Sequence, residues 1–256
     1  MTTAELKEFL DEKAELYERK SFIESDPITI PHLFTKKEDI EIAAFMAASI
    51  AWGKRTMIIK NGERLMQMMD NQPHDFILNA SPSDYKRFEP FVHRTFSGQT
   101  TIYFIKSLQN IYLNHNGLET LFTDGFNKTQ SIEGALAHFR NQFLFDPNTN
   151  PEQLRQVPNV EKNSACKRLN MFLRWMVREK KRGVDFGLWK DIPQSQLMIP
   201  LDLHSGGVSR KLGLLTRNQD DWKSVLELTI ALREFDKEDP IKYDYALFGL
   251  GVFEKF

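Results

Sequence analysis

The sequence predicts an all-α protein built from many short helices. Apolar residues recur at three- and four-residue spacing in successive stretches, which is the period of one helix face. Runs of β-branched residues with period-two alternation, which would indicate half-buried strands, are absent. Proline, glycine and small polar residues interrupt the helical pattern at short intervals. We therefore expect helices packed on helices and no sheet.

The length and composition of the chain exclude several classes of protein. The chain of 256 residues is long enough for one large domain or two lobes with a substantial core. Its formal net charge of -1 gives no general attraction to nucleic acid, although a local basic patch is compatible with it. One cysteine excludes an intrachain disulfide framework and a four-cysteine iron–sulfur cluster. No run resembles a signal peptide or a membrane span, so we expect a cytoplasmic protein.

The first half of the chain contains several predicted helices. Residues 3–20 place Leu6 and Leu10 on one apolar face. The stretch from Glu38 to Gly53 is apolar nearly all round and should be a central buried helix. The segment DPITIPHLF holds two prolines and is expected to be an extended connector. Further helices are predicted at about 55–69, 100–113 and 131–143, with two short ones between 73 and 91.

In the second half, the pattern predicts helices at about 220–235 and 240–252. DPNTNPEQ, residues 146–153, is the clearest linker in the chain. The basic run from Arg178 to Arg182 could face phosphate, but we expect it to be a solvated helix end. It opens a hydrophilic insert, REKKRGVDFGLWKDIPQSQ.

Two residues between Asn163 and Leu214 are candidate catalytic groups. Lys167 lies early in an amphipathic helix, and Asp202 follows a proline at the start of another, where a carboxylate can cap free backbone N–H groups. By themselves these two positions favour the ordinary interpretation, a solvated lysine and a helix cap. The apolar face of the first helix consists of Leu169, Phe172, Leu173 and Met176.

The runs CKRLNMFLRW and PLDLHSGGVSRKLGL resemble the catalytic core of the helix-hairpin-helix (HhH-GPD) DNA glycosylases. That superfamily includes endonuclease III, the adenine mismatch glycosylase and the archaeal 8-oxoguanine glycosylases. From Ala44 to Phe253 the chain also resembles a bacterial family known as a domain of unknown function. The resemblance implies a single two-lobed helical unit over 1–256. Its lobes lie at about 37–145 and about 150–256, the second packed with helix 3–20.

The resemblance also implies the site residues. A hairpin of Asn163, Ser164, Ala165 and Cys166 would hold a DNA phosphate through backbone N–H groups. Lys167 would be the nucleophile, and Asp202 would stabilise positive charge on the sugar or shuttle protons. The remaining DNA-binding candidates are Arg168, His204, Arg210 and Trp52.

Several of these residues have a second interpretation. Trp52 could stack on an unpaired base, or it could end a core helix and pack inward. His204 is expected to make local hydrogen bonds rather than bind metal, since no second histidine lies at ligand spacing. Cys166 could have a lowered pKa at a helix start, but no paired base accompanies it.

The chain departs from the superfamily pattern at three places. Asn163 and Ala165 occupy positions that are usually glycine, although asparagine tolerates the left-handed conformation that such a turn needs. The insert lengthens the separation between Lys167 and Asp202, and the pair Gly206-Gly207 loosens the start of the second helix.

The function implied by the resemblance is excision of a damaged base by a DNA glycosylase that also has AP lyase activity. Its partner would be a damaged DNA duplex, with no membrane, metal or cofactor involved. Two alternatives remain open. One is a nucleic-acid-binding or structural protein that keeps the fold without the chemistry, and the other is a helical enzyme acting on an unrelated small substrate.

Overall fold

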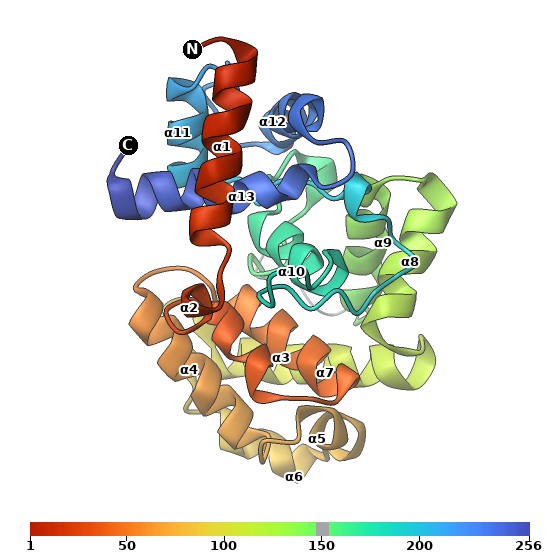
Figure 1. Cartoon of the computed structure of the whole chain (residues 1–256). Helices are drawn as coiled ribbons and strands as arrows, with labels where there is room; N and C mark the ends of the chain where they lie inside the picture. Colours follow the sequence, from red (N-terminus) through yellow and green to blue (C-terminus); the bar gives the residue numbers. More distant parts are fainter. Residues whose placement is uncertain (147–153) are drawn as a thin grey trace. The chain divides into compact units, whose positions relative to one another are not determined.

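The computed structural model describes residues 1–146 and 154–256. Within these ranges the all-α prediction is confirmed, since helices account for nearly all of the regular structure (Figure 1). The chain forms two compact units. One comprises residues 1–24 and 159–256 and is called the terminal unit below, and the other comprises residues 25–158 and is called the middle unit. Most of the linker predicted at 146–153 lies outside the described residues.

The middle unit is organised around one buried helix, α3 (Lys37–Ser49), as its apolar sequence predicts. Phe45 of α3 lies 5.4 Å from the rings of both Phe139 and Phe143, and 5.6 Å from that of Phe104. Burial of such aromatic clusters is a large favourable contribution to folding. The other helices of the unit are α4 (Arg55–Met68), α5 (Pro73–Asn79), α6 (Pro82–Tyr85), α7 (Gly98–Asn114), α8 (Gly117–Thr129) and α9 (Ile132–Phe143).

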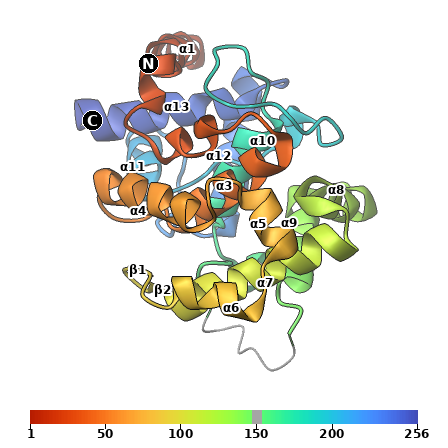
Figure 2. The same ribbon diagram turned by 90° about the horizontal axis from the view of Figure 1, so that it is seen from below.

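Two sequence expectations for the middle unit are wrong. The expected connector at DPITIPHLF forms two 3-10 turns, η1 (Pro27–Thr29) and η2 (Pro31–Leu33). Each turn begins with proline, which loses no hydrogen bond at a first helical position. The expected absence of strands is also wrong, because β1 (Val92–His93) and β2 (Phe96–Ser97) pair as an antiparallel hairpin beside α7 (Figure 2). Two-residue strands are too short to show an alternation in sequence.

In the terminal unit, α1 (Thr3–Tyr17) lies across α13 (Tyr243–Gly249) (Figure 1). The two helices approach closely at Gly249, where a Cβ atom would lie 2.0 Å from the ring of Tyr17. The remaining helices are α2 (Lys20–Ile23), α10 (Lys167–Val177), α11 (Leu203–Lys211) and α12 (Trp222–Phe235). Short turns are η5 (Val160–Lys162), η6 (Gln194–Gln196), η7 (Pro240–Lys242) and the π-helical η8 (Leu250–Glu254).

The insert after α10 is packed against that helix. The backbone N–H groups of Phe186 and Trp189 donate to the carbonyls of Trp175 and Met176, at 2.8 and 3.0 Å. They satisfy carbonyl groups that would otherwise be free at the helix end. Trp189 is buried, and its ring lies edge-on to Phe172 of α10 at 5.3 Å.

The expectation of a solvated basic run is wrong for Arg178. Its side chain is only 3% exposed and forms ion pairs with Glu18, Asp185 and Asp239. The adjacent positions Lys180, Lys181 and Arg182 are exposed, as expected. The pattern failed at Arg178 because a buried charge requires partners, and two of them, Glu18 and Asp239, are distant in sequence.

The close approach at Gly249 gives a stability prediction. Substitution of Gly249 by alanine places a methyl group inside the contact distance of the Tyr17 ring, so α1 and α13 must separate. We expect the free energy of unfolding to fall by about 2 kcal/mol and the melting temperature to fall by roughly 5 °C, measured by circular dichroism.

Gly207→Ala is the matched control, because a Cβ atom at Gly207 would meet nothing within 4 Å. Alanine in the interior of α11 should leave stability unchanged or raise it by about 0.5 kcal/mol. Equal stability of Gly249→Ala and the unsubstituted protein would show that the two helices do not require this approach.

Candidate active site

The predicted hairpin turns with two residues in the left-handed conformation. Asn163 has φ 62° and Cys166 has φ 50°. The conformation at Asn163 is one that asparagine adopts more readily than most residues. Its side-chain Nδ2 donates to Asp221 Oδ2 at 2.9 Å, and its carbonyl accepts from the Trp222 N–H at 3.1 Å. The hairpin is therefore attached to the first turn of α12.

The hairpin leads directly into α10, whose first residue is Lys167. Among the described residues, the Cys166 side chain at the N-cap position makes no capping hydrogen bond to this helix. Asn170 fixes the junction, because its Nδ2 donates back to the carbonyl of Ala165 at 3.1 Å. The positive end of the α10 dipole is thus presented next to Lys167 without a side-chain cap, an arrangement that suits an anion.

Lys167 and Asp202 lie together. Lys167 Nζ is 3.6 Å from Asp202 Oδ2, and the two side chains are 29% and 25% exposed. The other carboxylate oxygen of Asp202 caps α11, accepting from the N–H groups of His204 and Ser205 at 2.9 and 3.0 Å. Oδ1 is used by the helix, and Oδ2 faces the amine.

A third ionisable group, Asp244 of α13, lies behind this pair and was missed from the sequence. Burial raises the pKa of Asp244 to about 6; the Asp202 carboxylate adds to the rise, and the cations of Arg174 and Lys167 oppose it. Arg174 NH1 donates to its carboxylate. The available signal was an aspartate surrounded by aromatic residues in the run YDYALFG, since a carboxylate on a buried helix needs a specific reason to be there.

The other predicted residues of the terminal unit are arranged around the hairpin and α11. Ser164 forms a backbone bridge with Asp221. Burial lowers the pKa of the Arg168 guanidinium to about 10, and the nearby Cys166 thiol opposes this fall. His204 is exposed on the first turn of α11. Arg210 forms an ion pair with Asp220 at 2.6 Å and also donates to the backbone of that loop, so it is engaged within the protein.

Trp52 belongs to the middle unit, whereas Lys167 and Asp202 belong to the terminal unit. It follows the end of α3 and is half-buried. Its ring lies edge-on to His93 at 5.6 Å, and its carbonyl oxygen is 3.2 Å from His93 Nε2. His93 thus contacts both the ring and the backbone at this helix end.

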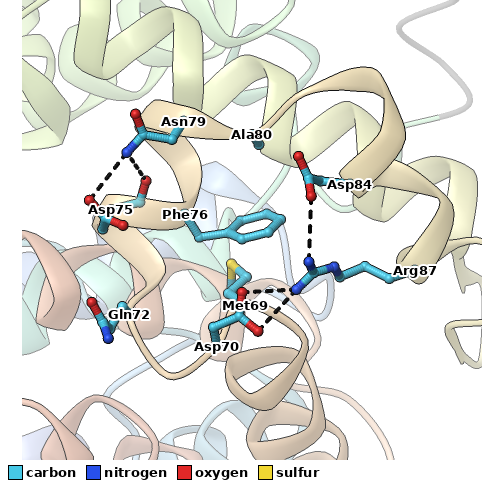
Figure 3. Close-up of a pocket in the computed structure, with 9 residues that line it drawn as sticks. All are labelled: Met69, Asp70, Gln72, Asp75, Phe76, Asn79, Ala80, Asp84 and Arg87. Carbon is cyan, nitrogen blue, oxygen red and sulfur yellow. Dashed lines mark hydrogen bonds and ion pairs between the residues drawn. The ribbon is translucent and has the colours of Figure 1, made fainter.

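Two pockets of the middle unit contain no predicted site residue. One, of about 230 Å³, is shown in Figure 3, where Arg87 lies between Asp70 and Asp84 and pairs with both. The other, of about 270 Å³, contains Glu41, whose carboxylate accepts from Tyr112 at 2.7 Å. In both pockets, charged side chains of the wall are paired with one another.

Within residues 1–146 and 154–256, there is no group of three or more histidine, cysteine, aspartate or glutamate side chains that could hold a metal ion. Within the same ranges, every helix is too short or too polar to cross a membrane.

The family comparison covers this entire site. Residues 26–253 match the family model described as "Protein of unknown function (DUF2400)". The chain belongs to the DUF2400 family. The DUF2400 match includes Lys167, Asp202 and Asp244, and it spans the middle unit together with most of the terminal unit. No curated protein and no solved structure matches the chain.

The hairpin geometry gives a prediction at Asn163. Asn163→Gly keeps the left-handed backbone accessible but removes the hydrogen bond to Asp221, so we expect a loss of about 1 kcal/mol. Asn163→Ala removes the same bond and also makes the backbone conformation unfavourable, so its loss should be about 2 kcal/mol. Urea unfolding of the two variants measures the difference.

The comparison between the variants isolates the backbone contribution, because both lose the same side-chain bond. Equal destabilisation by glycine and alanine would contradict a left-handed residue at position 163.

Proposed function

We propose that this protein is a DNA glycosylase with AP lyase activity and an HhH-GPD fold, acting on damaged duplex DNA in the cytoplasm. The observation that carries the proposal is the 3.6 Å approach of Lys167 Nζ to Asp202 Oδ2, with both side chains partly exposed at the starts of two helices. The spacing of the two residues in sequence does not require this proximity. It is the arrangement that a lysine nucleophile and its carboxylate partner need.

The chemistry assigned to the pair is nucleophilic displacement at a sugar carbon. The neutral amine of Lys167 attacks C1′, and the C1′–N bond to the base breaks with its electron pair leaving on the base. Asp202 takes a proton from the attacking nitrogen, and that proton can then neutralise the departing base. When the C1′–O4′ bond opens, O4′ takes a proton from solvent water and the nitrogen lone pair forms an iminium ion, from which strand cleavage can follow.

Asp202 is well placed for a second task in the same reaction. Positive charge develops at C1′ as the base leaves, and a carboxylate oxygen directed towards the amine stabilises that charge. Because Oδ1 is held by two backbone N–H groups of α11, the carboxylate cannot rotate without losing the helix cap. Its orientation is thus fixed before substrate binds, which limits the reorganisation needed in the transition state.

The hairpin gives a second argument for the proposal, which concerns how the DNA would be held. A base must leave the duplex before its sugar can be attacked, and a phosphate next to it must be held in place. The start of α10 has no side-chain cap and carries the nucleophile as its first residue, and its positive dipole end favours a phosphate there. Attachment of Asn163 to Asp221 keeps this segment in place.

The first test is covalent trapping with borohydride, which reduces an iminium ion to a stable amine. The unsubstituted protein should become linked to a duplex carrying a damaged base or an abasic site. Lys167→Ala should abolish the linkage while melting temperature and DNA affinity stay nearly unchanged. Lys181→Ala, at an exposed lysine paired with Glu179, is the control and should trap normally. Trapping by Lys167→Ala would place the nucleophile elsewhere.

The second test separates the two tasks of Asp202. Asparagine caps helices about as well as aspartate, so Asp202→Asn should leave the melting temperature unchanged. The substitution removes the charge facing Lys167, and we expect single-turnover base excision to slow by about a hundredfold. Unchanged single-turnover kinetics in this variant would limit Asp202 to a capping role.

A further inference from the structure

Asp244 is a buried ionisable group that the proposed mechanism leaves without a role. Its side chain is 9% exposed, and it lies on α13 rather than on either helix that carries the reacting pair. A carboxylate is rarely this buried unless it forms a structural ion pair or takes part in the chemistry of a site. Pairing with Arg174 explains how the carboxylate is tolerated, but not why it lies next to Lys167 and Asp202.

Two cations and two carboxylates form neighbouring ion pairs here, and Arg174 also pairs with the buried Asp185 of the insert at 3.3 Å. Lys167 and Arg174 are seven residues apart on α10, which places them on one face of that helix, two turns apart. Lys167 pairs with Asp202 at the start of α11, and Arg174 pairs with Asp244 on α13. Since α11 packs against α13, both carboxylates lie on the side of α10 that carries the two cations.

We propose that Asp244 is a positioning residue of the candidate active site, acting through Lys167. This inference rests on the proposed glycosylase function. The carboxylate of Asp244, held by Arg174, provides a second negative charge behind that of Asp202. It stabilises the positive charge that the Lys167 nitrogen carries once it has bonded to C1′. In a site of low dielectric constant, such a charge acts over several ångströms and does not need direct contact.

The reaction rate should then depend on whether the Asp244 carboxylate is ionised. Its raised pKa, about 6, results first from burial, so the carboxylate is ionised above this pH and neutral below it. The charged groups facing it are Arg174 and Lys167 from α10, Asp202 at the start of α11, and Asp185 from the insert. On the α1 side, Glu18 and Asp11 face the neighbouring tyrosines Tyr245 and Tyr243 of the same helix.

The test is single-turnover borohydride trapping on a duplex with one abasic site, followed from pH 5 to pH 8. An abasic site presents the C1′ aldehyde directly, so the assay does not depend on knowing which damaged base is recognised. In the unsubstituted protein, the rate should fall as pH drops through about 6, because the Asp244 charge is lost. Asp244→Asn should be slower by about tenfold at pH 7.5, and the fall near pH 6 should be absent.

Two further variants separate this role from a structural one. Glu41→Gln is the control, because Glu41 is a comparably buried carboxylate of the middle unit that accepts from Tyr112, and its loss should leave the fall near pH 6 in place. Asp244→Glu keeps the charge and should recover the pH dependence. Imidazoles titrate in the same range, so the fall must also persist in His204→Gln, whatever that substitution does to the rate itself.

The outcomes distinguish this inference from the proposed function. Trapping by Asp244→Asn with an unchanged rate and pH profile overturns the role of Asp244 and leaves the glycosylase proposal intact. A flat profile between pH 5 and pH 7 in the unsubstituted protein does the same, and this measurement needs no variant to fold. Absence of trapping in the unsubstituted protein at every pH removes the proposed function and this inference with it.

Discussion

The guanidinium of Arg178 joins three separated parts of the terminal unit through buried ion pairs. Its NH2 donates to Glu18 just after α1 at 2.9 Å, and its NH1 donates to Asp185 in the insert at 2.9 Å. Nε and NH2 each donate to the Asp239 carboxylate, just before α13, at 2.8 Å. Loss of one partner from such a group leaves an uncompensated buried charge, which commonly costs about 3–5 kcal/mol. The relative positions of α1, α10 and α13 therefore depend on this one side chain.

This constraint also determines where the candidate active site can form. Arg178 immediately follows α10, so its ion pairs fix the end of the helix, while the insert satisfies the terminal carbonyls. At the opposite end, Asn163 attaches the hairpin to α12. Because α10 is held at both ends, Lys167 has little freedom of position along the helix axis. A nucleophile needs this kind of support, since small displacements from the reacting geometry reduce rates strongly.

The predictable parts of the structure were those determined by local sequence. The buried face of α10 follows from apolar residues at three- and four-residue spacing, and the cap of α11 follows from an aspartate after proline. Helix α8 was not predicted, and Asn116 and Gln130, which bound it, are both left-handed non-glycine residues that carry no strong end signal. The partners of Arg178 could not be predicted either, because Glu18 is separated from it by 160 positions and no periodic pattern records such a pairing. The pairing of Asp244 with Arg174, 70 positions away, was unpredictable for the same reason, although the aspartate among aromatic residues was itself a visible signal.

The interruption of the terminal unit in sequence has a consequence for its synthesis. Residues 1–24 emerge from the ribosome before the middle unit, but their partners at 159–256 follow only after the whole middle unit has been made. The middle unit is continuous and can fold as soon as it is complete. Until the last helices appear, Leu6 and Leu10 of α1 lack the surface that buries them, and Glu18 lacks its arginine. The segment that forms α1 therefore keeps its apolar residues exposed until residues 159–256 have been made.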